Sequence, residues 1–116
     1  MANVLVHVAT GPENATRAAL GLLVARTAAE EGHQVNVFLA GDAVHLARAE
    51  TAAATQGIGT GSVVEHLAAL KAAGVTVFLS GMSSKARGVE GGEDYELVPP
   101  QKLVELATAS DTVLTY

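Results

Sequence analysis

The sequence contains no cysteine among its 116 residues. This absence excludes disulfide bridges, thiolate zinc sites, iron–sulfur clusters and catalysis by a cysteine nucleophile on this chain. The chain therefore cannot by itself perform sulfur or redox chemistry that depends on a protein thiol.

Aromatic residues and cations are also scarce. The chain has two Phe, two Tyr and no Trp, and its seven Lys and Arg stand against twelve Asp and Glu, for a net charge of −5. Nucleic-acid binding depends on cations that neutralise phosphates and on aromatic rings that stack on bases. We therefore expect no nucleic-acid partner.

Long apolar runs are missing as well. No segment approaches the roughly 20 consecutive apolar residues of a membrane-spanning helix. The first residues, MANVLVHVATG, lack a basic region, and their apolar run is too short for a signal peptide. We expect a cytoplasmic protein without a membrane partner.

What the chain does have is apolar surface in excess of a small monomer's needs. Hydrophobic residues make up 49% of the sequence, many of them Ala, whereas charged residues make up 16%. This composition and length are typical of one globular domain, which we place at residues 1–116. The apolar surplus favours an interface between subunits.

Stretches with strand character alternate with stretches of helical periodicity. The expected strands cover residues 3–10, 34–40, 75–80 and 111–116. The expected helices cover residues 11–32, 42–55, 63–74 and 99–110, with Asp42 and Ser62 as N-caps of the second and third. Residues 56–61 and 89–98 are expected loops, the latter with a brief extended piece near Tyr95. The order predicts an α/β fold, a doubly wound, mostly parallel sheet of four to five strands with helices on both faces.

Ligands of such sheets bind outside the carboxyl ends of the strands. Three strands end in small or polar residues, and the third is followed at once by a short helical turn carrying two cations. The candidate ligand-binding residues are Thr10, Gly41, Asp42, Ser80, Gly81, Met82, Ser83, Lys85 and Arg87. Free N–H groups, hydroxyls and cations in that turn would suit a small anion. The competing interpretation is that the serines cap the turn while Lys85 and Arg87 lie in solvent.

The sequence offers little for catalysis or metal binding. Ser80 is a candidate nucleophile only if His7, on the first strand, acts as its base, and no nucleophile-elbow or S-x-x-K motif surrounds it. His7 is otherwise expected to be a buried or interfacial residue with a hydrogen-bond partner, and His33 and His66 are expected at the surface. No metal-ligand spacing occurs, so we expect neither a metal nor a cofactor.

The stretches VFLSGMSSKARG (77–88) and ELVPPQKLVELATASDTVLTY (96–116), with FLAGDAVHLA (38–47), closely resemble the DsrE/DsrF-like family of small sulfur-relay proteins. The most specific parts of this resemblance are Gly81 to Ser83, Lys85 to Gly88 and Asp111 to Tyr116. The resemblance covers essentially the whole chain. It implies a flavodoxin-like architecture of three layers and assembly into homotrimers or hexamers.

In sulfur-transferring members of that family, a cysteine near the end of the third strand carries sulfur as a persulfide. The corresponding residue here is Ser80, and an oxygen cannot take up sulfane sulfur as a thiolate does. The resemblance therefore implies a binding or accessory role, with a small anion, a sulfur species or a sulfur-relay protein as partner. A hydrolase or transferase using Ser80 and a histidine, or a purely structural subunit, are the alternatives.

Overall fold

The computed structural model describes all residues, 1–116, and confirms the predicted fold class. Five parallel strands form one sheet in the order β6-β5-β2-β1-β7. The strands are β1 (Asn3–Val8), β2 (Gln34–Leu39), β5 (Thr76–Ser80), β6 (Tyr95–Val98) and β7 (Thr112–Thr115). The first strand of the chain thus lies inside the sheet, between β2 and the last strand. The expected extended piece near Tyr95 is the edge strand β6.

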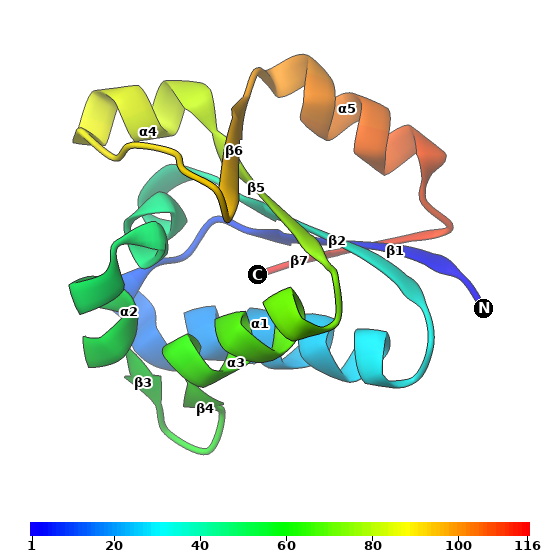
Figure 1. The fold of residues 1–116 in the computed structure, drawn as a ribbon, viewed down its shortest axis with the longest axis horizontal. Coiled ribbons are helices and arrows are strands. Elements are labelled where there is room, and N and C mark those ends of the chain that lie inside the picture. The colour runs from blue at the N-terminus through cyan, green and yellow to red at the C-terminus, as the bar shows by residue number, and fades with distance from the viewer.

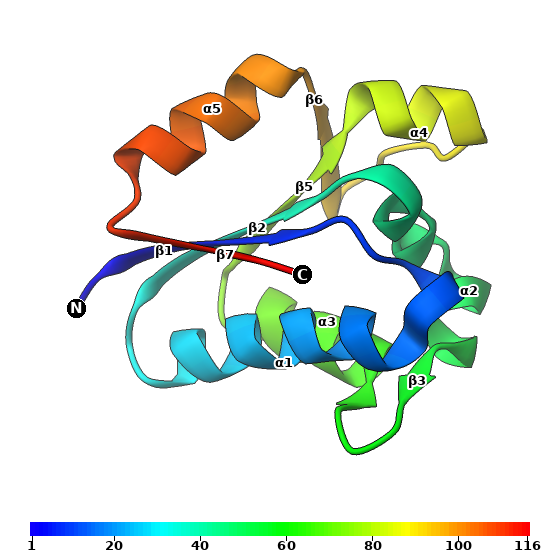
Figure 2. The ribbon, with the colours of Figure 1, turned by 180° about the vertical axis from the view of Figure 1, so that it is seen from behind.

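Helices cover both faces of the sheet, as Figures 1 and 2 show. On one face lie α1 (Ala15–Glu30), which follows the short 3₁₀ helix η1 (Pro12–Asn14), and α3 (Val63–Ala72). The opposite face carries α4 (Gly81–Arg87) and α5 (Pro100–Ala109). None of these helices combines the length and the apolar character that crossing a membrane requires.

The apolar core is divided unequally between the two faces. The larger part joins the strands to α1, α3 and neighbouring segments and includes Val6, Val37, Leu22 and Leu70. The smaller part consists of Leu5, Phe38, Phe78 and Val98, with partly buried residues of α5 packed against it. Side chains alternate between the two faces along each strand, which assigns His7 to the α5 face together with Leu5.

The region after β2 differs from the prediction. A single helix over 42–55 was expected, but the structure has a 3₁₀ helix, η2 (Gly41–Ala47), followed by the short helix α2 (Ala49–Ala54). Arg48 separates them with extended backbone angles, φ −78° and ψ 129°. Asp42 lies inside the first turn of η2 and caps nothing, so its prediction as an N-cap is wrong.

The glycine-rich segment after α2 forms a small hairpin of β3 (Gln56–Gly57) and β4 (Gly61–Ser62) rather than an irregular loop. Its last residue, Ser62, accepts a hydrogen bond from the N–H of Glu65 at 3.4 Å and caps α3, as predicted. His66 on that helix is buried, and its Nε2 lies 2.8 Å from the carbonyl oxygen of Thr60 in the hairpin. The surface position expected for His66 is therefore wrong.

Candidate functional site

The carboxyl ends of β1, β2 and β5 meet at one edge of the molecule. Thr10 and Gly11 follow β1, and a Cβ added to Gly11 would collide with the carbonyl oxygen of Asp42, after β2. The N–H of Gly41 donates a 2.9 Å hydrogen bond to the Oγ of Ser83, in the helix that follows β5. The topology thus brings the three predicted strand ends together, and we call residues 10–11, 41–42 and 80–87 the strand-end rim.

The serines of the rim are engaged by backbone groups. Ser80 is half-buried at the end of β5, and its Oγ accepts a 3.2 Å hydrogen bond from the N–H of Ser83, which makes it the N-cap of α4. The Oγ of Ser83 accepts from Gly41. One hydroxyl has no such role: Ser84 Oγ is fully buried without a hydrogen-bond partner. The two serines predicted to face a ligand therefore already fix the local backbone.

The two cations of the rim differ in their surroundings. Arg87 forms an ion pair with Asp42, with 3.0 Å between Nε and Oδ1, and also donates to the carbonyl oxygen of Ser83 at 3.2 Å. Its own carbonyl oxygen accepts a 2.7 Å hydrogen bond from Arg48. Lys85 is exposed and makes no ion pair. Arg87 is thus a link between η2 and α4, and the cation available to a ligand is Lys85.

An open apolar hollow of about 540 Å³ adjoins the rim. It is lined by Gly81, Met82, Leu97, Val98, Pro99, Pro100 and Gln101. Met82 is 71% exposed, and Leu97 is 45% exposed. Gly81 and Met82 were predicted from the sequence, whereas the residues of β6 and α5 were not, because their position beside α4 depends on the pairing of β6 with β5.

His7 does not form a catalytic pair with Ser80. Its ring meets Phe38 edge-on, with 5.9 Å between centroids, and its buried Nε2 has no hydrogen-bond partner, contrary to the prediction of one. Burial lowers the pKa of His7. The Ser80 Oγ accepts its hydrogen bond from Ser83 instead. His33 is half-buried, and its Nδ1 accepts from the N–H of Ala2 at 3.0 Å, so its expected surface position is only partly correct.

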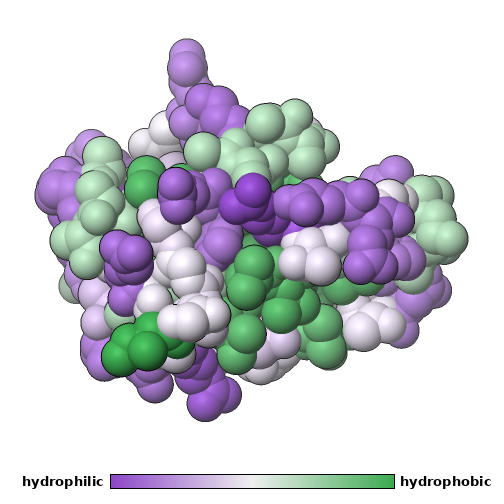
Figure 3. All heavy atoms as spheres, turned by 90° about the horizontal axis from the view of Figure 1, so that it is seen from below, coloured by the Kyte–Doolittle hydropathy of each residue, from purple (hydrophilic) through white to green (hydrophobic).

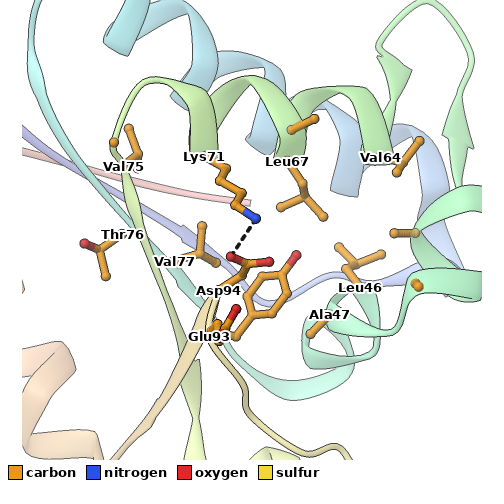
Figure 4. Close-up of a pocket in the computed structure, with 15 residues that line it drawn as sticks. Leu46, Ala47, Val64, Leu67, Lys71, Val75, Thr76, Val77, Glu93 and Asp94 are labelled. Atoms are coloured by element: carbon orange, nitrogen blue, oxygen red, sulfur yellow. Dashed lines mark ion pairs between the residues drawn. The ribbon is translucent and has the colours of Figure 1, made fainter.

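A second and more enclosed cavity, of about 550 Å³, lies at the other end of β5 (Figure 4). Its walls are mainly apolar and come from η2, α2, α3, the first part of β5 and residues 93–95. The Nζ of Lys71 pairs with Asp94 at 2.9 Å across it. Tyr95 belongs to its lining, and burial, followed by the charge of Asp94, raises the pKa of this phenol. No sequence motif pointed to this cavity, which depends on segments far apart in the chain.

Comparison with known proteins decides the family. A sequence model described as the DsrE/DsrF-like family matches residues 2–116. The chain belongs to the DsrE/DsrF-like family. The crystal structure of the YchN protein from E. coli superposes with a TM-score of 0.79 at 24% identity, and the alignment covers 100% of both chains. At that identity the likeness concerns the fold. No curated protein matches the chain in sequence.

The DsrE/DsrF-like family is related to sulfur relay. The residue at the end of β5, where the resemblance places a persulfide-carrying cysteine, is Ser80, and the whole chain lacks cysteine. This DsrE-like chain therefore has the family's fold without a thiol to carry sulfur.

Proposed function

We propose that this chain is a cytoplasmic, self-assembling member of the DsrE/DsrF-like family that binds a sulfur-relay partner without carrying sulfur itself. The observation that carries the proposal is the state of Ser80. Its oxygen stands at the expected position of the reactive sulfur and is occupied as the N-cap of α4. A hydroxyl neither ionises near neutral pH nor exchanges sulfane sulfur, so recognition is the role left to the rim.

Of the two non-covalent roles, the geometry favours a protein partner over a small anion. The hydroxyls of Ser80 and Ser83 accept from backbone N–H groups, and Arg87 is paired with Asp42, which leaves Lys85 as the accessible cation. By contrast, the adjoining hollow offers the exposed side chains of Met82 and Leu97. Exposed apolar side chains around a hollow are typical of a protein-binding surface.

Self-assembly into homotrimers or hexamers is part of the proposal. Its support is the family membership together with large apolar side chains left at the surface, among them Ile58 at 89% and Val104 at 62% exposure. Sedimentation of the purified chain should give a species larger than its 11.8 kDa monomer. A monomer at all working concentrations would contradict this part.

Two experiments test the binding role. After incubation with a small persulfide donor, intact mass should show the unmodified chain, and a stoichiometric sulfur adduct would refute the proposal. Native mass spectrometry with a cysteine-bearing DsrE-like protein, loaded with sulfur, should show a complex that Met82→Glu removes and Lys85→Ala retains. If the chain instead binds thiosulfate, and Lys85→Ala abolishes that binding, the small-anion role is the correct one.

A further inference from the structure

Helix α1 carries large apolar side chains on the side that faces away from the sheet as well as on the side that faces it, although Thr27 on the outer side is polar and exposed. Its inner side buries Ala18, Leu22 and Ala25 against the strands. Leu20 is nevertheless 36% exposed, and Leu23 and Val24 are only half-buried. Figure 3 views the molecule from the side of α1 and α3 and shows a continuous apolar area there. Large apolar side chains on the solvent side of a helix indicate that another surface covers them.

Two unpaired charges lie at the ends of this outer stripe. Residues on one side of the helix follow one another at this spacing: Arg17, Leu20, Val24, Thr27 and Glu31. Arg17 and Glu31 are exposed and have no ion-pair partner in the chain, whereas Arg26 on the same helix pairs with Glu30 at 2.7 Å. Each also stands at the end of α1 where the helix dipole disfavours its sign. Their placement is therefore not explained by the stability of the helix alone.

We propose that α1 is a self-pairing surface, on which a second copy of this chain packs its own α1 in the antiparallel direction. Val24 stands midway between Arg17 and Glu31, so a twofold axis at Val24 brings Arg17 opposite Glu31 of the partner subunit at both ends. A parallel pair would place like charges together. The stripe is thus complementary to itself, in charge as well as in apolar character, and this identifies a second copy as its occupant.

The hairpin beside α1 extends the same surface. Ile58 at its tip is 89% exposed, and the tip is held on the first turn of α1 by two hydrogen bonds. Thr16 Oγ1 accepts from the N–H of Ile58 at 3.1 Å, and the Thr16 carbonyl oxygen accepts from Thr60 Oγ1 at 2.9 Å. In an antiparallel pair, each fixed tip lies toward the C-terminal part of the partner's α1. Ile58 then loses much of its exposure to water.

The inference rests on the proposed self-assembly and specifies it. An interface around a twofold axis uses the same surface on both copies and closes on itself. The assembly therefore holds an even number of chains, either a dimer or a hexamer built from two trimers. A lone trimer cannot contain this interface.

Charge reversal at the two ends of the stripe tests the pairing. Arg17→Glu and Glu31→Arg each create like-charge contacts at both ends and should raise the dissociation constant of the twofold contact about tenfold or more. The double variant Arg17→Glu/Glu31→Arg restores opposite charges and should recover most of the wild-type affinity. Both reversals suit the helix dipole, so weakened helices cannot account for the single-variant losses. Sedimentation velocity over a dilution series measures the effect, with circular dichroism as a check on folding.

Lys102→Glu, on α5 at the opposite face of the sheet, makes the same charge change as Arg17→Glu and should leave the dissociation constant of the twofold contact at α1 unchanged. Leu20→Gln gives a second test, because it removes apolar contact without changing charge and should also weaken pairing. If the wild type is oligomeric but Arg17→Glu and Leu20→Gln assemble normally, or if the double variant fails to recover, this inference is wrong and the proposed self-assembly stands. A monomeric wild type overturns both the pairing through α1 and the proposed self-assembly. It does not affect the proposed binding role, which the intact-mass test with a persulfide donor examines separately.

Discussion

Ser80→Cys is the substitution that most directly tests the strand-end rim. It places a thiol where the resemblance to sulfur-relay proteins expects one, at the N-cap of α4. The thiol replaces the oxygen that accepts from the Ser83 N–H at 3.2 Å, so the folded state loses a good cap. We expect the free energy of unfolding to fall by about 1 kcal/mol.

The same helix end should make the thiol more acidic. The N-terminal dipole of a helix stabilises a nearby negative charge by about 1 kcal/mol at a partly exposed site. Since 1.36 kcal/mol corresponds to one pKa unit, the thiol pKa should fall from about 8.5 to about 7.8. At pH 7 the thiolate fraction then rises roughly fivefold, from about 3% to about 14%. That thiolate can attack the outer sulfur of a small persulfide donor. A new S–S bond then forms on Cys at position 80, the S–S bond of the donor breaks, and the rest of the donor leaves as a thiolate.

Ser62→Cys provides the matched control. Ser62 also caps a helix, α3, through the N–H of Glu65, but it lies in the hairpin away from the strand ends. The thiol pKa is measured by ultraviolet titration of the thiolate, and sulfur loading by intact mass. Because both residues cap helix N-termini, we expect the pKa of both thiols to fall, and a greater sulfur loading of Ser80→Cys than of Ser62→Cys then measures what the rim adds beyond acidity. If Ser80→Cys folds normally but has an ordinary thiol pKa and stays unloaded, the rim is not organised for sulfur binding.

Three further outcomes follow from contacts described above. His7→Leu removes a buried, unpartnered nitrogen, so the free energy of unfolding in urea should rise by about 1 kcal/mol. Because burial lowers the pKa of His7, the wild type loses stability as pH falls below about 6.5, and the advantage of His7→Leu should grow between pH 7 and 5; a constant difference would contradict this. Gly11→Ala forces a Cβ onto the Asp42 carbonyl and should lower the free energy of unfolding by about 3 kcal/mol, whereas a change under 1 kcal/mol would show that the rim yields easily. Burial and the charge of Asp94 raise the pKa of Tyr95, so Tyr95 should ionise at lower pH in Asp94→Asn, as measured by absorbance in a Tyr116→Phe background. The stability that the neutral Tyr95 contributes to the folded state should be lost as pH rises above about 10.

The sheet and its helices were predictable because their patterns are local. Continuous apolar stretches such as residues 3–8 mark strands covered on both faces, and the alternation with helices leaves few topologies. β6 was harder, since four residues after a glycine-rich stretch are too few to indicate a strand; its pairing with β5 settles it. The break at Arg48 is a tertiary effect, because its side chain bonds to Arg87 39 positions away.

The site was predictable in outline only. Topology alone indicated that Thr10, Asp42 and Ser80 lie near one another, because the carboxyl ends of parallel strands share an edge. Residue types could not decide whether the serines face a ligand or the backbone, since both uses require the same hydroxyl. Nor could they show that Arg87 is neutralised by Asp42, because that ion pair joins residues 45 positions apart.

The place of β7 also affects how the chain is made. The carboxylate of Asp111 accepts from the N–H of Asn3, 108 positions earlier, and the N–H of Tyr116 donates to the carbonyl oxygen of His7. During synthesis, one side of β1 therefore stays without its neighbour until β7 has left the ribosome. Contacts this distant in sequence slow folding, and for that interval an open apolar strand can pair with another chain. Chaperone dependence should thus be concentrated in the interval between the synthesis of β1 and that of β7.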